Sequence, residues 1–499
     1  MGFEMGIDIA LINPGDRRQV YQELGKELSA VEPPFLAASL LSYLKGLGFK
    51  ARLVDSNALN ITPEETARMV KEMDPLVAGV IVYGQQPSAS TQNMTIAGRI
   101  CGALKDEGIR TAIGGLHPSA LPRRTMEEEK VDFAVEGEGQ RTFEGLLSVL
   151  KAGGREYSGV PGLWWREDGR VRHNALPALM ADLDRALPIA AWDELPMDRY
   201  RAHNWHCFDS PSERSPYAAI YTSLGCPWSC VFCCINAPFG KPGIRYRSPE
   251  LVVEEIGLLH EGYGVRNLKI SDELFVLDER HYMKIADLII ERGYPLNIWA
   301  YARVDTVKRE NFEKMKRAGV NWLALGIESA NPDVRDGAEK RMRARDIKAT
   351  VRAIQAAGIR VIGNYIFGLP GDTLSTMRET LDMALDLNCE FANFYCAMAY
   401  PGSKLYEMAV KEDWAVPGEW HGFSQHSYEM LPLPTKCLSA REVLGFRDRA
   451  FHEYFGSPAY LEMIEQRFGA EVKRHIAGMS STSLKRKLLE EGVCTGGVK

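Results

Sequence analysis

Short apolar segments alternate with amphipathic helical segments along most of this chain, in two separate runs. Strands that alternate with helices pair in parallel, so each run predicts an α/β unit built on a parallel sheet. The first run occupies residues 6–150, where we expect strands at 7–15, 50–56, 75–84, 109–115 and 131–137. It predicts a doubly wound, Rossmann-like domain, and such domains bind ligands at the carboxyl ends of their strands.

The second run begins near Pro216 and contains six strand–helix units. We expect its strands at 217–225, 267–275, 296–305, 321–329, 361–371 and 391–402. Because the crossovers between parallel strands are right-handed, six units make an open, partial (β/α)6 barrel. The chemistry of such barrels lies at the carboxyl ends of the strands.

The boundaries follow from these two runs. We expect an N-terminal domain at 1–150, a connector at 151–215, a barrel at 216–420 and a small C-terminal helical region at 421–499. The connector contains a hairpin-like segment at 162–174, and the C-terminal region is helical from about residue 442 to 491.

The composition narrows the classes of function. Hydrophobic residues make up 45% of the chain and charged residues 25%, with a net charge of −6, which argues against a broad nucleic-acid interface. No apolar run is long enough to cross a bilayer, and the first residues lack the pattern of a signal peptide, so we expect a cytoplasmic location. The basic cluster in "SLKRKLLEEG", at 483–492, is typical of a solvated helix face rather than of a DNA-reading module.

Four of the ten cysteines lie within nine positions, in the loop after the first expected barrel strand. Cys226, Cys230 and Cys233 form a C-x3-C-x2-C motif, and Cys234 follows directly. Disulfides are rare in the cytoplasm, so such a cluster indicates a metal site.

The spacing of the motif favours an iron–sulfur cluster. A structural zinc ion needs four ligands, usually as two separated pairs, and Cys234 is a poor fourth ligand because neighbours on a tight loop point apart. Three thiolates on one loop suit one face of an iron–sulfur cube, which leaves one iron open to bind a substrate. A zinc site and a metal-free thiol loop remain the alternatives.

This motif, at the end of the first strand of a six-unit partial barrel, resembles the radical S-adenosylmethionine (radical SAM) superfamily over residues 216–420. The resemblance implies a 4Fe–4S cluster on Cys226, Cys230 and Cys233, whose open iron chelates the amino and carboxylate groups of S-adenosylmethionine. It implies that electron transfer from the cluster cleaves the sulfonium to give a 5′-deoxyadenosyl radical. An electron donor such as flavodoxin or ferredoxin would then be a partner.

The resemblance also implies contacts to S-adenosylmethionine at the other strand ends. Asp272 and Glu273 match the position of the contact to the amino group, because an ammonium needs anionic acceptors. Arg303 would bind the carboxylate with its fork of donors, and Glu328 would accept hydrogen bonds from the ribose hydroxyls.

Four further residues complete the expected barrel site. Gly368 and Gly371 would allow the backbone to approach the adenine. Cys234 and Cys396 are candidates for donating a hydrogen atom or gating the site.

The doubly wound domain resembles the cobalamin-binding domain of cobalamin-dependent radical SAM enzymes, which include class B methyltransferases and the anaerobic Mg-protoporphyrin ester cyclase. The similar segments are "GGLHP" at 114–118 and "EGEG" at 136–139. They imply cobalamin contacts at Gly114, Gly115, His117, Glu136, Gly137 and Gly139. The hydroxyls of "SAST", beginning at Ser88, would face the nucleotide tail.

The chain lacks the D-x-H-x-x-G motif with which other cobalamin domains ligate cobalt. We therefore expect no histidine ligand and a side chain from "YGQQP" at the lower face of the cofactor. The candidates are Tyr83, Gln85 and Gln86. A domain that has lost its corrin is the alternative.

Two facing cofactor domains imply C-methylation of an unactivated carbon, with the methyl group supplied by methylcobalamin. The alternatives are a radical cyclisation or rearrangement, an oxidoreductase without methyl transfer and, from another class, a cobalamin-binding regulatory module. The cysteine motif disfavours the regulatory module, because a vestigial site has no reason to keep three cluster thiols. The substrate is an unidentified small molecule or peptide.

Overall fold

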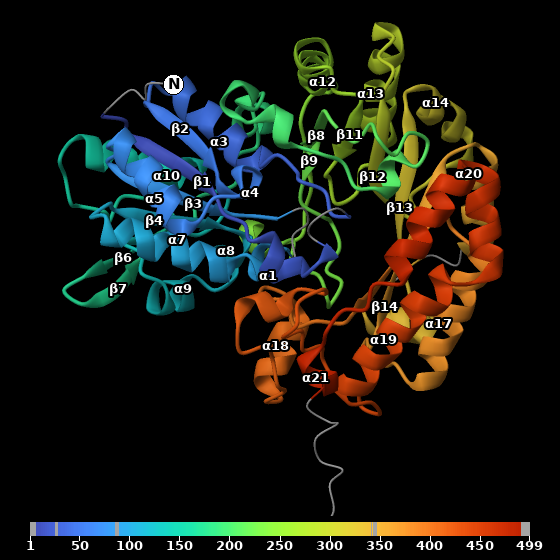
Figure 1. Cartoon of the computed structure of the whole chain (residues 1–499). Coiled ribbons are helices and arrows are strands. Elements are labelled where there is room, and N and C mark those ends of the chain that lie inside the picture. Colours follow the sequence, from blue (N-terminus) through green and yellow to red (C-terminus); the bar gives the residue numbers. More distant parts are fainter. Residues whose placement is uncertain (1–5, 25–27, 85–88, 341, 343–346, 491–499) are drawn as a thin grey trace, which may run out of the picture.

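The computed structural model of the chain describes residues 6–24, 28–84, 89–340, 342 and 347–490. Two α/β units lie beside one another, the first blue to teal and the second green to orange in Figure 1. Among the described residues, no helix combines the length and the apolar composition that crossing a membrane requires.

The N-terminal unit is built on a seven-stranded sheet with the order β2-β1-β3-β4-β5-β6-β7. Strands β1 to β5 are parallel, as the alternating sequence predicts. The strands are β1 (Ile9–Asn13), β2 (Ala51–Asp55), β3 (Val77–Val82), β4 (Thr111–Gly115), β5 (Phe133–Val135), β6 (Leu163–Glu167) and β7 (Arg170–His173).

Helices cover both faces of this sheet, which confirms the doubly wound architecture. The long helices are α3 (Phe35–Gly46) and α10 (Gln140–Lys151), which pack together, and α5 (Pro63–Met73) and α7 (Met94–Asp106), which do the same. Each pair belongs to a different hydrophobic cluster. The short helices are α1 (Arg17–Tyr21), α4 (Ser56–Leu59), α6 (Ala89–Gln92), α8 (Leu116–Ala120) and α9 (Pro122–Glu128).

The hairpin expected in the connector forms, but it extends the N-terminal sheet. β6 pairs antiparallel with β5, and β7 with β6. Trp164 and Trp165 alternate along β6 and are buried in the two different hydrophobic clusters. A strand with an apolar side chain for each face joins the sheet because both faces of the sheet are covered.

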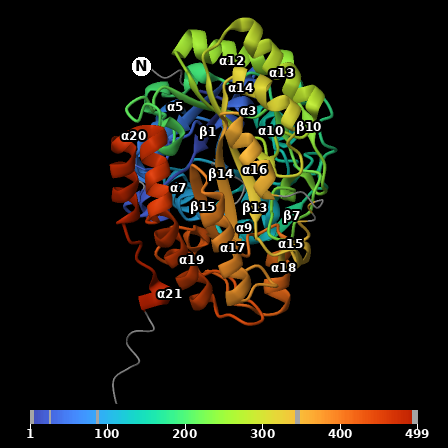
Figure 2. The ribbon, with the colours of Figure 1, turned by 90° about the vertical axis from the view of Figure 1, so that its right-hand side faces the viewer.

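The second unit is a parallel six-stranded sheet with the order β15-β14-β13-β12-β11-β8. It curves into a half-barrel, with helices on its outer side in Figures 1 and 2. The strands are β8 (Tyr217–Ile220), β11 (Asn267–Ile270), β12 (Asn297–Arg303), β13 (Val320–Glu328), β14 (Arg360–Phe367) and β15 (Phe391–Cys396). A small ribbon of β9 (Ser223–Leu224) and β10 (Arg245–Tyr246) flanks the cysteine loop.

The helices that follow the barrel strands begin and end at local signals. α12 (Pro249–Tyr263) begins at the N-cap Ser248 and ends at Gly264, and α13 (Glu279–Arg292) ends at Gly293. The others are α14 (Phe312–Arg317), α15 (Pro332–Gly337), α16 (Ile347–Ala356), α17 (Leu374–Leu387) and α18 (Lys404–Lys411).

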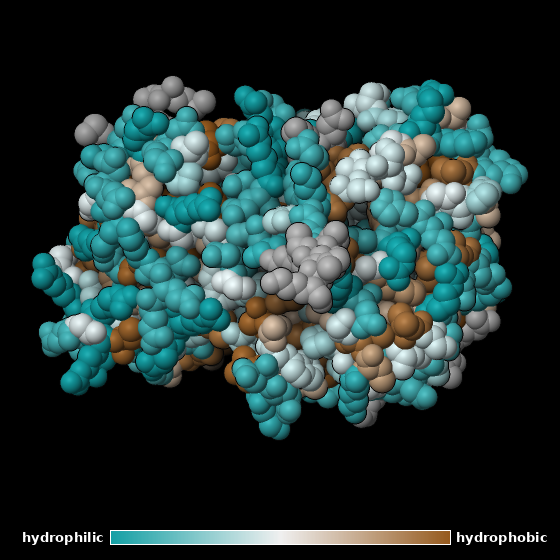
Figure 3. All heavy atoms as spheres, turned by 60° about the horizontal axis from the view of Figure 1, so that its bottom comes forward, coloured by the Kyte–Doolittle hydropathy of each residue, from teal (hydrophilic) through white to brown (hydrophobic). Residues whose placement is uncertain are grey.

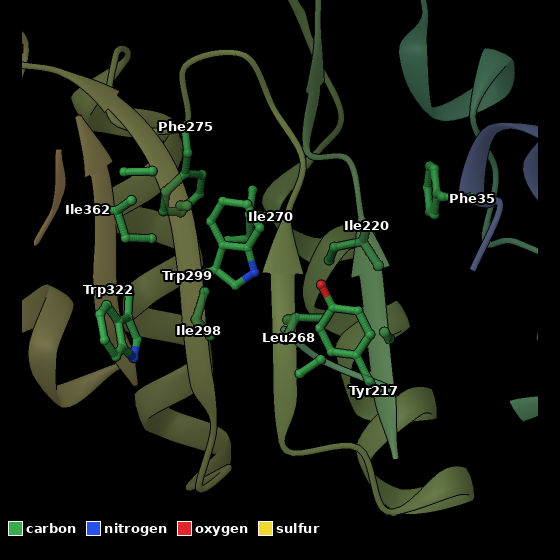
Figure 4. Packing of buried hydrophobic residues seen from close by; sticks show 14 of the residues in the cluster. Phe35, Tyr217, Ile220, Leu268, Ile270, Phe275, Ile298, Trp299, Trp322 and Ile362 are labelled. Carbon is green, nitrogen blue, oxygen red and sulfur yellow. The ribbon is translucent and has the colours of Figure 1, made fainter. Parts of the chain in front are cut away.

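The hydrophobic core continues from one unit into the other. One cluster contains Phe35 of α3, Trp192 and Trp205 of the connector, and Trp299 of β12. Figure 4 shows how residues of neighbouring barrel strands pack, with Phe35 on the side of the N-terminal unit. The connector carries α11 (Leu183–Ala186) and the 3-10 turns η1 (Trp192–Glu194), η2 (Met197–Arg199) and η3 (Trp205–Cys207).

The C-terminal region is helical, as expected. It contains η6 (Trp420–Phe423), α19 (Ala440–Phe455), α20 (Pro458–Ser480) and α21 (Lys487–Glu490). α19 packs on β15 and α17, so the region lies against the barrel. Figure 3 shows this end of the molecule from below, where hydrophilic side chains predominate and apolar ones form small separate patches.

The interpretation of the basic cluster 485–487 as a solvated helix face is wrong for its central residue. Arg486 is only 2% exposed, while Lys485 and Lys487 are exposed. Its guanidinium donates to the carbonyl oxygens of Ser427 and Gln425 and pairs with Asp448 of α19. These partners come from segments distant in sequence, so the local pattern of charges did not reveal them.

Candidate functional site

The cysteine motif lies on the loop between β9 and β10, at the carboxyl end of the barrel. The amide of Gly243 donates to the carbonyl oxygen of Cys226 (3.0 Å), and the amide of Cys233 to that of Cys230 (3.0 Å). Cys226, Cys230 and Cys233 are partly exposed free cysteines, whereas the adjacent Cys234 is only 2% exposed. The loop therefore separates three accessible thiols from a fourth, buried one.

Cations and a tryptophan surround these thiols. The guanidinium of Arg303 lies over the ring of Trp228, within the motif, at 4.4 Å from the ring centre. Burial raises the pKa of the Cys226 thiol to about 11 and also raises the pKa of Cys230, and Lys340 opposes both rises. Among the residues that the structure describes, no three His, Cys, Asp or Glu side chains are arranged to hold one metal ion, whereas an iron–sulfur cube would bind each of the three thiols to a separate iron.

The two acidic residues after β11 have different surroundings. Asp272 is fully buried and accepts hydrogen bonds from the amide of Thr222 (2.6 Å) and the hydroxyl of Ser223 (2.7 Å). Its carboxylate thus fixes the chain that leads into the cysteine loop. Glu273 is partly exposed, and burial, with Asp272 adding to it, raises the pKa of its carboxyl to about 8. Glu273 is the one of the pair whose carboxylate remains available to a ligand.

Arg303 is the last residue of β12, and its guanidinium already binds a carboxylate of the protein. Its Nε and one Nη donate to the two carboxylate oxygens of Asp305, at 2.9 and 3.1 Å. The fork that the sequence assigns to the carboxylate of a ligand is therefore directed at Asp305 in this structure. Sequence reasoning missed Asp305, although it lies two residues after Arg303 in the same "ARVD" segment.

Glu328 ends β13 with a positive φ of 65°, at a shift in the register with β14. It is buried and accepts a hydrogen bond from Lys340 (2.6 Å). Despite its burial, Lys340 has a raised pKa, because Glu328 and Cys230 favour its charged form. Lys340 was missed because the segment after α15 carries no recognisable motif.

The two glycines after β14 differ in their surroundings. Gly368 has a φ of 81°, and a Cβ there would lie 2.6 Å from Val443 of α19. At Gly371 the nearest atoms, those of Val334, would be at an ordinary 3.8 Å. The need for glycine at 368 comes from its backbone conformation and the packing of α19.

The two candidate catalytic cysteines lie apart from one another. Burial raises the pKa of both Cys234 and Cys396 to about 12. The charges that act on Cys396 are those of Arg447, Asp448 and Arg486, on the C-terminal side of β15. Neither thiol lines the three cavities described next.

Three cavities are lined by residues of the N-terminal unit, of the barrel or of both. The glycine cavity, of about 50 Å³, is lined by Gly114, Gly115, Gly137, Gly139, Tyr83 and Leu224, among others. The interdomain cavity, of about 90 Å³, is lined by Asn13, Glu32, Tyr83, Gln92 and Tyr221, among others. The barrel cavity, of about 210 Å³, is lined by side chains of β11 to β15. Tyr83 lines the first two cavities, and Tyr21 and Gln92 line the last two.

The expected cobalamin residues divide into two groups. Tyr83 and the glycines at 114, 115, 137 and 139 line the glycine cavity, whereas Gln85, Gln86 and Ser88 lie outside the described residues. Gly115 has a φ of 129°, and a Cβ there would lie 2.2 Å from the carbonyl oxygen of Val82. Glycine at position 115 is thus required by the close contact between β3 and β4, in addition to any contact with a cofactor.

The side chains of His117 and Glu136 contact other side chains of the protein. The buried ring of His117 hydrogen-bonds Thr91 (3.1 Å) and meets the ring of Trp420 at 4.5 Å, and burial lowers its pKa to about 3. Glu136 accepts from the indole of Trp164 (2.7 Å). Glu138, which sequence reasoning missed within "EGEG", lines the glycine cavity and pairs with Arg245 of β10 (3.1 Å from Nη1).

Two family models match the chain. The radical SAM superfamily model matches residues 220–384, and the B12 binding domain model matches residues 24–147. These ranges cover the barrel strands β11 to β14 and the parallel strands β2 to β5.

Relatives match over most of the chain. An uncharacterized methyltransferase of Pyrococcus horikoshii is 29% identical over 451 residues, which cover 90% of this chain and 93% of that protein. The anaerobic magnesium-protoporphyrin IX monomethyl ester cyclase of Cereibacter sphaeroides is 24% identical over 433 residues, 85% of this chain and 67% of the cyclase.

The fold as a whole is similar to that of a solved structure. The cobalamin-dependent S-adenosylmethionine radical enzyme OxsB, with aqua-cobalamin and S-adenosylmethionine bound, superposes with a TM-score of 0.68 at 15% identity, covering 95% of this chain and 72% of OxsB. The two family models together place a B12 binding domain ahead of a radical SAM domain in this chain.

Proposed function

We propose that the protein transfers a methyl group from S-adenosylmethionine to an unactivated carbon of a small organic substrate, in the space between its two units. The observation that supports this most directly is that the interdomain cavity shares lining residues with the glycine cavity and with the barrel cavity. Leu224 and Ile235, on either side of the cysteine motif, help to line the glycine cavity of the N-terminal unit. The loop that carries the cysteines therefore contributes to the wall of the glycine cavity.

The residues present fit the groups that the family implies. Three accessible thiols beside Arg303 and Lys340 suit an anionic 4Fe–4S cluster, since thiolates prefer such clusters and cations offset their charge. The glycine turns place backbone in the wall of the glycine cavity, where part of a cobalamin would lie against them. When bound, these groups supply the reductive cleavage of S-adenosylmethionine and a transferable methyl group.

The side chains at the strand ends would bind and orient S-adenosylmethionine. Glu273 would pair with its amino group, and the ammonium would lower the pKa of the Glu273 carboxyl from its raised value. Glu328, held by Lys340, would accept hydrogen bonds from the ribose hydroxyls. Arg303 would meet the carboxylate by exchanging Asp305 for the ligand.

The net reaction determines how much S-adenosylmethionine and how many electrons the protein needs for each methyl transfer. One S-adenosylmethionine gives its methyl group and leaves as S-adenosylhomocysteine. A second takes up one electron and the hydrogen atom of the substrate's C–H bond, and leaves as 5′-deoxyadenosine and methionine. A second electron is needed because the methyl group leaves S-adenosylmethionine as a methyl cation and joins a carbon radical. The electrons require a donor such as flavodoxin or ferredoxin, and a reducing compartment such as the cytoplasm keeps the thiols free.

The test uses protein purified and reconstituted without oxygen with iron, sulfide and hydroxocobalamin. It is incubated with S-adenosylmethionine deuterated in the methyl group, a reductant, and a small-molecule extract. The proposal predicts a deuterated methyl group in one product, with S-adenosylhomocysteine and 5′-deoxyadenosine formed alongside it. 5′-Deoxyadenosine without any transferred label would overturn methyl transfer.

The likeness to the magnesium-protoporphyrin cyclase supports a second candidate, a radical cyclisation or rearrangement. That reaction would form 5′-deoxyadenosine and an unlabelled product. A variant with Cys226, Cys230 and Cys233 all replaced by alanine is the control for both candidates, because it should form no 5′-deoxyadenosine.

A further inference from the structure

The barrel cavity is enclosed by segments from all parts of the chain. Its walls come from β11 to β15, from Tyr21, Leu24, Leu28 and Ser29, from the connector at 203–205, and from the loop at 425–426. The loop is fixed to the sheet, because the side chain of Gln425 accepts from the amide of Cys396 (2.9 Å) and donates to its carbonyl oxygen (3.0 Å). The cavity has a volume of about 210 Å³, which is large enough for an organic ring system and not only for single water molecules.

The charged side chains that line this cavity already have acidic partners. Lys269 pairs with Glu32 at 3.0 Å, and Arg447 shares Asp448 (2.7 Å) with Arg486. No Asp or Glu is found among the described residues that line it. A cationic ligand would therefore meet no carboxylate, and an anionic ligand would have to displace Glu32 or Asp448 from a buried pair, which is costly.

The two histidines in the wall add no charge at neutral pH. Burial lowers the pKa of His426 to about 3, with Arg447 and Arg486 adding to the effect. Burial also lowers the pKa of His203 well below its usual value, with Lys269 adding to it. Both rings are therefore neutral surfaces.

Aromatic rings make up much of the wall. Trp205 meets Trp299 edge to face at 5.1 Å between ring centres, and Trp299 meets Tyr301 in the same way at 5.0 Å. Tyr395 and Tyr400 also line the cavity. Such walls favour a flat ring that can add further edge-to-face or offset contacts.

Asn393 of β15 offers the wall an acceptor that no protein group uses; in the same wall, Trp299 Nε1 and His426 Nδ1 also lack a hydrogen-bond partner among the described residues. Asn393 of β15 donates from its side-chain amide to Asn364 Oδ1 on the neighbouring β14, at 2.9 Å, and Asn364 in turn donates to the carbonyl of Leu325. Within the part of the chain that the structure describes, Asn393 Oδ1 accepts no hydrogen bond. An amide oxygen in a cavity wall selects a ligand with an N–H or O–H donor.

We propose that the substrate, or the part of it that enters the barrel, is an uncharged aromatic ring system with a hydrogen-bond donor on its edge that is received by Asn393. This inference rests on the proposed function, since it names the substrate class of the same site. The inference excludes phosphorylated and carboxylated compounds as ligands of the barrel cavity.

The test measures binding to the reconstituted protein by equilibrium dialysis, without turnover. The probes are 2-naphthol, which is neutral and carries a donor, 2-methoxynaphthalene, which lacks the donor, and 2-naphthoate, which is anionic. We expect 2-naphthol to bind about fivefold more tightly than 2-methoxynaphthalene, the value of one neutral hydrogen bond. We expect 2-naphthoate to bind at least about tenfold more weakly than 2-naphthol.

Three variants locate the contact. Asn393→Leu should reduce the affinity for 2-naphthol to that for 2-methoxynaphthalene, while Asn393→Gln, which keeps an uncharged amide oxygen and an amide donor, should retain more of it. Gln466→Met, which removes an exposed amide on α20, should change nothing. The iron content and the thermal midpoint report whether each variant is folded.

Two results would overturn the inference: 2-naphthoate binding as tightly as 2-naphthol, or none of the three probes binding. An unchanged affinity in folded Asn393→Leu would overturn the role of Asn393. Because binding needs no methyl transfer, a protein that binds 2-naphthol but transfers no label contradicts the proposed function alone.

Discussion

Glu32 of the N-terminal unit forms an ion pair with Lys269 of β11 inside the barrel, with 3.0 Å between Glu32 Oε2 and Lys269 Nζ. Both side chains are buried, and the other oxygen of Glu32 accepts from the hydroxyl of Tyr217 at 3.2 Å. Glu32 lines the interdomain cavity and Lys269 lines the barrel cavity. The pair therefore connects the walls of the two cavities and ties one unit to the other.

Glu32→Gln should destabilise the protein, because it leaves the ammonium of Lys269 buried without this carboxylate. Breaking one side of a buried ion pair costs about 3 kcal/mol, so the free energy of unfolding in urea should fall by about that amount. Glu412→Gln, at an exposed glutamate after α18, is the matched control and should change it by less than about 0.5 kcal/mol. Equal effects of the two substitutions would contradict a stabilising role for the pair.

Single replacements in the cysteine loop should separate three ligands from a structural neighbour. Cys226→Ser, Cys230→Ser and Cys233→Ser should each lose most of the iron, which we expect at about four atoms per chain in the reconstituted protein. Cys234→Ser, beside them but buried, should keep its iron. Iron analysis and the absorption spectrum check this, and loss of iron from Cys234→Ser alone would reverse the assignment.

Much of the fold could be predicted because of its parallel sheets. Strands such as β3, which is buried along its whole length, form continuous apolar runs that are recognisable in the sequence. The C-x3-C-x2-C motif was also recognisable in the sequence, since its spacing is local. Partners that come from distant loops were not. Lys340 meets Glu328, and Arg486 meets Asp448, only because the folded chain brings those segments together.

Lys340→Met should lower the reduction potential of the cluster. Its ammonium acts on Cys230 and therefore stabilises the additional negative charge of the reduced state. Removing one positive charge at this range should shift the midpoint by about 50–100 mV to more negative values. A redox titration without S-adenosylmethionine measures this, and Lys340→Arg should stay close to the unchanged protein. A shift in both variants would point to altered packing instead of charge.

Glu273 should make stability depend on pH. Burial raises the pKa of its carboxyl from 4.5 to about 8, so the folded state binds more protons than the unfolded state between these values. Stability in the cofactor-free protein should therefore fall as pH rises from about 4.5 to 8. Glu273→Gln removes this loss and should be more stable than the unchanged protein by about 2 kcal/mol at pH 8, but not at pH 4. Urea unfolding at both pH values decides it, and a gain that is the same at pH 4 would contradict the protonation argument.

Arg486→Met should loosen the wall of the barrel cavity from outside. Arg486 donates to the carbonyl oxygens of Gln425 and Ser427, and Gln425 in turn is paired with the backbone of Cys396 at the end of β15. Without the guanidinium, two buried carbonyl groups and part of Asp448 lose their partner, which should cost about 3 kcal/mol.

The neighbouring Lys485 provides the control, because its side chain is exposed on the same short segment. Lys485→Met should leave both the stability and the binding of 2-naphthol unchanged. Arg486→Met should lower the thermal midpoint and weaken 2-naphthol binding, since the loop that carries Gln425 and His426 is no longer fixed. If Arg486→Met lowers the midpoint yet binds 2-naphthol as before, the arginine supports the C-terminal helices and has no part in positioning the cavity wall.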